Sequence, residues 1–296
     1  MINDKKISVV ILAWNQLNET LECIESITAS CGIFPYIILV DNGSTDDTSS
    51  VILSHYGSLV KVIRSNINLG VSKGYNLGIK HALELGSDYI IITNNDVIFD
   101  PCMMLNLINF ANRDSKIGIV SPLILNYYNP KKIWMIGARW RKFPPTLKMI
   151  AYNETLNNNY KKPMELHYVP SCCYLITRNA ISDAGLYDEG YFIYFDDWDY
   201  SVRIRQAGYT IWLCPNAIAL HKISFSTKKQ HKPYKWWRQM GFSASRYYRK
   251  HHGKVEQIFG LGWMMTREII KLNPIEAINF FLGITDEIIK NSHGRI

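Results

Sequence analysis

Paired cysteines, long apolar runs and a leader segment are all missing from this sequence. None of its six cysteines belongs to a CxxC pair or a zinc-ligand spacing: Cys23, Cys31, Cys102, Cys172, Cys173 and Cys214. We therefore expect reduced, mostly buried thiols. The longest apolar runs, such as "AINFFLGI", are too short to cross a bilayer, and the start enters a strand pattern without a secretory signal. These absences favour a cytoplasmic globular protein.

Familiar phosphate loops and catalytic triads are missing as well. The stretch "GVSKGYNLG" matches neither the GxGxxG dinucleotide loop nor the Walker loop. No local signature marks a Ser-His-Asp or Cys-His arrangement, and six histidines have no partner pattern: His55, His81, His167, His231, His251 and His252. Hydrolase chemistry of the triad kind is therefore disfavoured.

Acidic residues are absent from His221 to Lys254, a stretch with ten Lys or Arg in a chain of net charge +8. Aromatic residues alternate with these cations: Phe225, Tyr234, Trp236, Trp237, Phe242, Tyr247 and Tyr248. Such a segment suits an anionic membrane surface or a nucleic acid. The structural alternative is a solvated helix face.

What the first half contains is a regular alternation of strands and helices. Four apolar runs are typical of buried parallel strands: Ile7–Ala13, Tyr36–Val40, Val60–Arg64 and Asp88–Thr93. Helical patterns separate them, and Asn18 is expected to cap the first helix. This order predicts an α/β fold with a doubly wound parallel sheet, whose ligands bind outside the carboxyl ends of the strands.

The second half is less regular. Residues 116–168 show few patterns beyond the turn signals "YYNPKK" and "KFPP". The remaining segments predict a strand at Tyr174–Thr177, a helix from Asp196 to Gln206 and two strands, "TIWL" and "AIALH". After His221 the pattern is helical to the end, with apolar positions spaced for an amphipathic face.

Polar residues follow each of the first four strands: Ala13-Trp14-Asn15, Asp41 to Ser44, Asn68 to Gly70, and Asn94-Asn95-Asp96. Each group alone fits a turn or a helix cap. Because a doubly wound sheet brings these ends to one edge, together they predict a single site.

Three carboxylates crowd the start of the last helix of this region, at Asp196, Asp197 and Asp199. Like charges in a half-buried site shift one another's pKa, which suits a catalytic carboxylate. Aspartates at a helix N-terminus also cap free N–H groups and favour the positive end of the dipole. The stretch alone leaves both interpretations open.

Five stretches together resemble the family 2 inverting glycosyltransferases, with rhamnosyltransferase-like and galactofuranosyltransferase-like members most similar: "ISVVILAWN", "ILVDNGSTDDT", "NLGVSKGYNLGIKHAL", "YIIITNNDVIFDP" and "GLYDEGYFIYFDDWDYSVRIRQAGYTIWLCPNAIALH". The resemblance covers about residues 7–225. It implies a GT-A fold, a Rossmann-like, mostly parallel sheet with a small antiparallel portion. It places the catalytic domain at 1–225, with a nucleotide-binding half to about 115 and an acceptor half after it. Residues 226–296 form a helical, basic-aromatic extension.

The resemblance also implies a role for each strand end. Trp14 would lie against the donor base, Asp41 would hydrogen-bond the pyrimidine, and Lys73 would contact phosphate. The full expected nucleotide-binding set is Ala13, Trp14, Asn15, Asp41, Asn68, Gly70, Lys73, Asn94 and Asn95.

For the chemistry itself, the resemblance implies Asp96 and His221 as ligands of a divalent metal, Mn²⁺ or Mg²⁺. Asp197 falls at the catalytic-base position, while Asp196 and Trp198 would contact the acceptor and Asp199 would be structural. Hard cations stabilise a diphosphate leaving group, and an imidazole ligand favours Mn²⁺. Asn94 departs from the family's DxD motif, which places more weight on His221.

The implied activity is inverting transfer from a pyrimidine-nucleotide sugar, dTDP-rhamnose first and UDP-galactofuranose second, to a hydroxyl of a surface glycan. A lipid-linked acceptor would place the protein at the inner face of the cell membrane. One alternative is a polyprenyl-phosphate glycosyltransferase, weakened by the lack of following transmembrane helices. A non-catalytic GT-A binding protein is another, kept open by Asn94. An acidic site disfavours nucleic acid. The extension would bind either membrane or a second copy in a homodimer.

Overall fold

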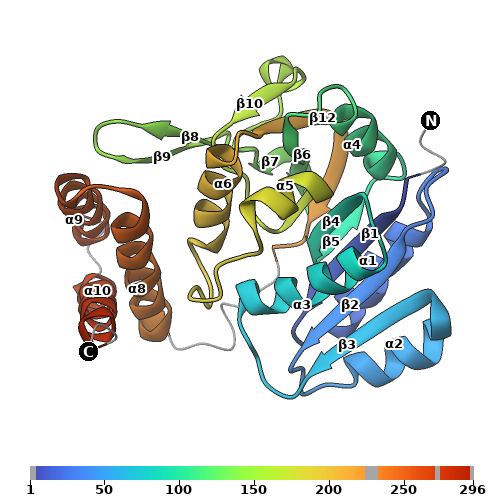
Figure 1. The fold of residues 1–296 in the computed structure, drawn as a ribbon, viewed down its shortest axis with the longest axis horizontal. Helices are drawn as coiled ribbons and strands as arrows, with labels where there is room; N and C mark the ends of the chain where they lie inside the picture. The colour runs from blue at the N-terminus through green and yellow to red at the C-terminus, as the bar shows by residue number, and fades with distance from the viewer. Residues whose placement is uncertain (1–4, 224–232, 271–273, 294–296) are drawn as a thin grey trace.

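The computed structural model describes residues 5–223, 233–270 and 274–293. An α/β body surrounds one ten-stranded sheet, and three C-terminal helices stand beside it (Figure 1). The main path of the sheet runs β10-β12-β6-β11-β4-β1-β2-β3, with β5 paired to β12 and β7 paired to β6. The chain begins on the right of this view and ends on the left.

The first half forms the predicted parallel strands. They are β1 (Ile7–Ala13), β2 (Tyr36–Asn42), β3 (Val60–Ser65) and β4 (Tyr89–Asn94), connected by α1 (Leu17–Thr28), α2 (Thr48–Tyr56), a short 3-10 turn (Gly57–Leu59) and α3 (Val71–Glu84). Ala13 pairs with Asp41, and Leu12 pairs with Asn94. The strand ends therefore meet at one edge, as predicted.

The predicted cap of the first helix is wrong. The helix α1 begins at Leu17 and its N-cap position is Gln16, not Asn18. Asn15 and Gln16 both have positive φ, at 61° and 67°, so the chain leaves β1 through two left-handed residues. Propensity for capping at Asn18 is overridden because the chain must turn at once at the strand end.

The second half contains more strands than the sequence predicted; β8 and β9 form a separate two-stranded hairpin, and the others join the main sheet. Residues 116–168, expected to be irregular, contain β6 (Ile117–Asn126), β7 (Asn129–Met135), β8 (Gly137–Arg141), β9 (Thr146–Ile150), a 3-10 turn (Asn158–Tyr160) and β10 (Met164–Leu166). Strand β6 is buried along nearly its whole length. Its Gly, Ser and Pro residues have low strand propensity, so the sequence pattern did not predict a strand that tertiary packing stabilises.

The remaining elements of the body surround the site. They are β5 (Val97–Phe99), α4 (Met103–Ala111), β11 (Cys173–Thr177), α5 (Arg178–Ala184), α6 (Asp196–Gln206) and β12 (Thr210–His221). Strand β11 lies antiparallel between β4 and β6. The two predicted strands "TIWL" and "AIALH" are one strand, β12, with a register shift between Cys214 and Ile218.

Two apolar clusters cover the two faces of the sheet. Val9 and Ile11 of β1 belong to one cluster, and Val10 belongs to the other. A strand buried on both faces reads as a continuous apolar run, which is why β1 was predictable. The six cysteines are free thiols, four of them buried and two exposed, as expected.

The C-terminal helices are α8 (Pro233–His251), α9 (Lys254–Ile270) and α10 (Pro274–His293). Helices α8 and α10 cross closely at two glycines, since a Cβ on Gly241 would meet the Phe280 carbonyl oxygen and one on Gly283 would meet that of Arg238. Arg238 and Asp286 also form an ion pair at 2.6 Å. The predicted domain boundary at 225–226 lies outside the described residues. Within the described ranges, every helix is too short or too polar to cross a membrane.

Candidate active site

A cavity of about 750 Å³ opens at the carboxyl ends of β1 and β4. Most of the predicted site residues line it: Trp14, Asn68, Gly70, Asn94, Asn95, Asp96, Asp196, Asp197, Trp198 and His221. One wall consists of the strand ends. The opposite wall comes from the β8–β9 hairpin, α8 and α9. We call it the acceptor wall, and the first the donor wall, after the substrates proposed for them below. The start of α6 lies between these two walls (Figure 1).

Four predicted nucleotide-binding residues lie outside this lining: Ala13, Asn15, Asp41 and Lys73. The Asp41 carboxylate is fully buried and accepts hydrogen bonds from the Ser44 amide, at 2.8 Å, and from the Ser49 hydroxyl. Asn15 accepts a hydrogen bond from the Thr45 amide at 2.8 Å. Asp41 and Asn15 therefore fix the turn after β2, and a direct contact of Asp41 with a pyrimidine stays a prediction.

Asn42 belongs to the polar strand end Asp41 to Ser44 that the sequence predicted for the site, but it was given no role of its own. Its side-chain oxygen accepts a hydrogen bond from the Leu69 amide at 2.9 Å, and its nitrogen donates to the Gly70 carbonyl at 3.1 Å. These bonds tie the end of β2 to the turn that begins α3. A polar residue at a strand end was the available signal.

The turn that begins α3 requires glycine at position 70, because a side chain there would clash. The φ of Gly70 is +82°, and a Cβ there would lie 2.4 Å from the Phe192 carbonyl oxygen. The same oxygen accepts a hydrogen bond from the Val71 amide at 2.6 Å. The turn at Asn68–Gly70 is thereby held against the loop that enters α6, so the donor wall and the acidic helix form one structure.

Asp96 and His221 come together at the donor wall. The Oδ1 atom of Asp96 lies 3.2 Å from Nε2 of His221, and both side chains are almost fully buried. Asp96 follows β4, while His221 ends β12 and pairs with Val97 of β5. The edge of His221 packs on Trp134, with ring centroids 4.5 Å apart. Two distant segments therefore present a carboxylate and an imidazole to the same point.

This pair fits a divalent cation. Two ligand atoms about 2.1 Å from one ion and at right angles to each other lie roughly 3 Å apart, close to the observed separation. Within the described residues, no group of three or more His, Cys, Asp or Glu side chains could hold a metal. The protein would thus supply two ligands and leave the other positions to substrate oxygens and water.

The two asparagines before Asp96 have structural partners. The side-chain oxygen of Asn94 accepts a hydrogen bond from the Tyr75 hydroxyl at 2.8 Å. The side chain of Asn95 donates to the Thr20 hydroxyl at 2.9 Å and to the Asn15 carbonyl at 3.1 Å. One lone pair of the Asn94 oxygen is therefore engaged by Tyr75, and the assignment of Asn94 to the nucleotide-binding set stays a prediction.

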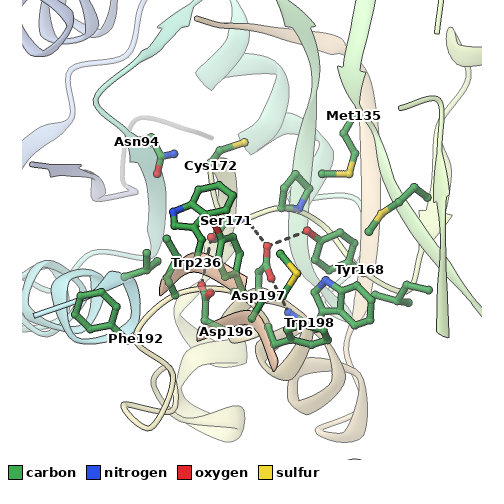
Figure 2. A pocket seen from close by; sticks show the side chains of 18 of the residues that line it. Asn94, Met135, Tyr168, Ser171, Cys172, Phe192, Asp196, Asp197, Trp198 and Trp236 are labelled. Atoms are coloured by element: carbon green, nitrogen blue, oxygen red, sulfur yellow. Dashed lines mark hydrogen bonds between the residues drawn. The ribbon is translucent and has the colours of Figure 1, made fainter. Parts of the chain in front are cut away.

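Asp197 is the better satisfied of the two carboxylates that face the cavity (Figure 2). It accepts hydrogen bonds from the Tyr168 hydroxyl at 2.8 Å, the Trp198 amide at 2.9 Å and the Ser171 amide at 3.4 Å. Asp196 accepts one from the Ser171 hydroxyl, at 3.4 Å.

Burial and proximity separate the two carboxyls electrostatically. Burial raises the pKa of Asp197 to about 6, although the Tyr168 hydroxyl and nearby amides oppose that rise. Burial and the adjacent charge of Asp197 raise the pKa of Asp196 well above its usual value. Because Asp197 has more hydrogen-bond donors, it is the first of the two carboxyls to ionise as the pH rises.

Backbone strain marks the entrance to α6. Tyr194 and Phe195 both have positive φ, at 64° and 60°, which bulky residues rarely adopt. Phe195 occupies the N-cap position without a side-chain cap. Two consecutive left-handed residues turn the chain sharply and place Asp196 and Asp197 beside the cavity. Such strain persists only where the surroundings hold it, and it concentrates at functional sites.

Asp199 lies outside the cavity lining. Its fully buried carboxylate lies 2.8 Å from Arg203 and 2.7 Å from each of Lys250 and His251. Burial alone would raise its pKa, but the hydrogen bond with His251 and the charges of Arg203 and Lys250 hold the pKa far below its usual value. Asp199 therefore joins α6 to α8.

The acceptor wall contains residues that the sequence analysis assigned elsewhere or missed. They are Arg141, Lys148 and Met149 of the hairpin, Trp236 and Met240 of α8, and Trp263, Met264 and Arg267 of α9. The basic-aromatic pattern did identify Trp236 and Trp237, but as membrane contacts. Instead Trp236 lines the cavity and Trp237 packs against the apolar cluster between α6 and the C-terminal helices.

Comparison with known proteins gives a family and a fold. The family model "Glycosyl transferase family 2" matches residues 8–184. An N-acetylglucosaminyl-diphospho-decaprenol L-rhamnosyltransferase of Mycobacterium tuberculosis is 27% identical over 213 residues, 64% of this chain and 67% of that protein. Galactofuranosyltransferase GlfT1 of the same organism is 22% identical over 221 residues, 73% of this chain and 70% of that protein.

Among solved structures, GalNAc-T7 with UDP, GalNAc and Mn²⁺ superposes with a TM-score of 0.62 at 16% identity, covering 83% of this chain. The match spans only about half of that longer protein, 51% of its chain. The mannosyltransferase PcManGT of Pyrobaculum calidifontis, with GDP-Man and Mn²⁺, gives 0.60 at 13% identity over 96% of this chain and 87% of that one. These likenesses confirm the expected GT-A fold.

Proposed function

The chain belongs to glycosyl transferase family 2, and we propose that this glycosyltransferase moves a sugar, with inversion, from a pyrimidine-nucleotide donor to a glycan hydroxyl. The observation that carries the proposal is a single cavity with two chemically different sides. The Asp96–His221 pair stands at the strand ends, and the ionised Asp197 stands at the start of α6. Leaving-group stabilisation and proton removal are the two tasks that sugar transfer requires.

The donor would bind at the strand ends. Asp96 and His221 would hold a divalent cation, which when bound neutralises charge on the leaving diphosphate. An imidazole ligand suits Mn²⁺ better than Mg²⁺. Trp14 and the turn at Asn68–Gly70 line the same wall and are placed to contact the nucleotide.

The acceptor hydroxyl would lose its proton to Asp197. Asp197 is half-buried, and this desolvation raises its pKa to about 6, so it is a stronger base than an exposed aspartate while still ionised at neutral pH. Tyr168 and the Trp198 amide hold it in place from two sides. Asp196, protonated beside it, can hydrogen-bond the acceptor without adding a second negative charge.

For the sugar, dTDP-rhamnose is the first candidate and UDP-galactofuranose the second. The support is similarity: relatives named as rhamnosyltransferases include the mycobacterial protein and the O-antigen chain rhamnosyltransferase WbaN of Salmonella anatum, 22% identical over 198 residues. The acceptor would be a glycan, carried on a lipid as in the name of the mycobacterial relative.

Membrane contact would involve α9 and α10 rather than the tryptophans of α8. Large apolar side chains are exposed on both helices: Val255, Ile258, Phe259, Ile275, Ile278 and Phe281. Together with the basic residues of α8, they would give reversible binding to an anionic membrane. Flotation with anionic and neutral liposomes tests this. Binding that ignores lipid charge and salt would argue for contact with a second copy instead.

A thermal-shift screen tests the donor assignment. The native protein would be heated with dTDP-rhamnose, UDP-galactofuranose, UDP-glucose and GDP-mannose, each with Mn²⁺ or with EDTA. A donor at 100 times its Kd stabilises the native state by about 2.7 kcal/mol, which raises Tm by several degrees. We expect a rise with a pyrimidine-nucleotide sugar and Mn²⁺ only. A flat result, or an equal rise in EDTA, would contradict the assignment.

A further inference from the structure

Among the described residues, acidic and basic side chains line opposite walls of the cavity. Among the described lining residues, the only acidic ones are Asp96, Asp196 and Asp197, at the strand ends and the start of α6. Of the Arg and Lys residues that the structure describes, those that line the cavity come from the opposite side: Arg141 and Lys148 from the β8–β9 hairpin and Arg267 from α9. Three cations that converge from two elements on one end of a cavity create a positive potential there.

Arg141 is held in place rather than mobile in solvent. Its guanidinium lies over the Trp263 ring, 5.7 Å from the centroid, and its side chain is half-buried. In the part of the chain that the structure describes, its buried Nε atom has no hydrogen-bond partner. A buried polar group without a partner is costly, and a guanidinium fork matches phosphate oxygens in geometry and charge. The observation points to an anionic ligand.

The position of these cations argues against the donor diphosphate as that ligand. The hairpin and α9 lie together on one side of α6, and β1 to β4 lie on the other (Figure 1). The donor diphosphate belongs at the Asp96–His221 pair by the proposed function, on the far side of Asp197. An anion held by Arg141 would therefore belong to the molecule that approaches Asp197 from the other side, which is the acceptor.

Apolar surface continues from the cations to the outside of the molecule. Met149, Trp263 and Met264 line the same end of the cavity. Along α9 the exposed residues Val255, Ile258 and Phe259 follow at helical spacing, at 67%, 70% and 53% exposure. Phe143, at the tip of the hairpin, packs edge-on against Phe259. A cationic pocket that opens onto an apolar strip fits an anion with an aliphatic chain.

We propose that Arg141, Lys148 and Arg267 bind the phosphate or diphosphate group of an amphiphilic acceptor, whose apolar chain lies along the exposed face of α9. This inference rests on the proposed function only in that it identifies the ligand as the acceptor. The binding site itself is inferred from the three cations and the exposed apolar residues of α9. It makes the hairpin and α9 the parts of the chain that select the acceptor.

Farnesyl diphosphate is the probe, with tryptophan fluorescence as the readout because Trp263 lies against Arg141. Titrations are done in EDTA, so that the metal site cannot retain a diphosphate, and are compared with farnesol and with inorganic pyrophosphate. We expect farnesyl diphosphate to bind at least tenfold more tightly than either, since charge-assisted hydrogen bonds and chain burial both contribute.

Variants separate this site from the donor site. Arg141→Gln and Lys148→Gln should each weaken farnesyl diphosphate about tenfold or more. The matched control is Lys142→Gln, which removes an equally exposed neighbouring lysine that does not line the cavity. Asp96→Ala should leave farnesyl diphosphate binding intact and remove Mn²⁺-dependent donor binding.

Three outcomes would overturn the proposal: equal binding of farnesol, equal loss in Lys142→Gln, or loss of farnesyl diphosphate binding in Asp96→Ala. Lys148 is exposed, so its variant should fold even if Arg141→Gln does not. A donor that fails to bind while farnesyl diphosphate still depends on Lys148 would refute the proposed function and leave this site standing.

Discussion

The two walls of the cavity differ in how the chain makes them. The donor wall comes from residues at or just after the ends of strands: the sheet brings Trp14 and Asp96 to one edge, and Asn42 holds the turn at Asn68–Gly70 beside them. The acceptor wall is assembled from the β8–β9 hairpin, α8 and α9, which meet only through tertiary packing. The first wall carries the asparagines and the Asp96–His221 pair, and the second carries the cations. The residues proposed for the donor are therefore positioned mainly by the sheet, while those proposed for the acceptor are added outside it.

Asp197 lies between the two walls, and its substitution should have the largest effect on the rate. Asp197→Asn keeps the shape and the hydrogen-bonding capacity but cannot take the acceptor proton. Turnover should fall about 10²–10⁴-fold, the usual contribution of a general base. Steady-state rates with saturating donor and acceptor check this.

Asp196→Asn is the control beside it, since that carboxyl should already be protonated near neutral pH and the change should act mainly on acceptor KM. A dead Asp196→Asn with a near-normal Asp197→Asn would move the base by one residue.

Substitution of Asp199 tests whether this third carboxylate has a structural role or takes part in the site. It is fully buried against Arg203, Lys250 and His251, so Asp199→Asn should cost about 3 kcal/mol of unfolding free energy, with little effect on the rate of the folded enzyme.

The pH dependence has a definite sign. The folded pKa of Asp199 is depressed, so the unfolded state binds the extra proton and the stabilisation is present above pH 4 and lost as the pH falls further. Denaturant unfolding of wild type and variant at pH 7 and at a pH of about 2 measures both effects, because the stabilisation is complete at the first pH and largely lost at the second. A variant with wild-type stability and a lost rate would place Asp199 in the catalytic machinery.

Tyr168 should produce the smallest change. Its hydroxyl donates to Asp197 at 2.8 Å and lowers the pKa that burial raises to about 6. Because the base acts in its ionised form, the rate should fall as the pH drops through about 6. Tyr168→Phe should move this acidic limb upward by about one pH unit, the equivalent of one charge-assisted hydrogen bond. A pH–rate profile is the measurement, and a profile that is merely lower at every pH would mean that Tyr168 acts only structurally.

Sequence patterns predicted the donor wall because its physics is local. An apolar run buried on both faces identifies a parallel strand, and the residue after it must lie at the sheet edge. Asp96 and the polar strand ends could therefore be placed from the order of residues alone. The start of α6 at Asp196 was predicted for a similar reason, from the acidic first turn and the Gly208 that follows the helix.

The acceptor wall could not be predicted in the same way. Strand β6 and the hairpin lack a clean alternation, and their formation depends on partners far away in the sequence. Trp236 was recognised as unusual but assigned to a membrane, because an aromatic-basic segment has the same composition whether it faces lipid or lines a cavity. Asn42 was placed at the predicted strand end but received no role, since its role depends on the turn at Asn68–Gly70.

Donor affinity measured by calorimetry, with Mn²⁺ and with EDTA, tests most directly whether the donor wall is the nucleotide-sugar site. The comparison uses wild type, Asp96→Asn, His221→Ala and Asp197→Asn. We predict that wild type and Asp197→Asn bind donor equally well and only with Mn²⁺, that His221→Ala binds more weakly, and that Asp96→Asn does not bind. Metal-independent binding in wild type, or loss of binding in Asp197→Asn with retention in Asp96→Asn, would contradict the account.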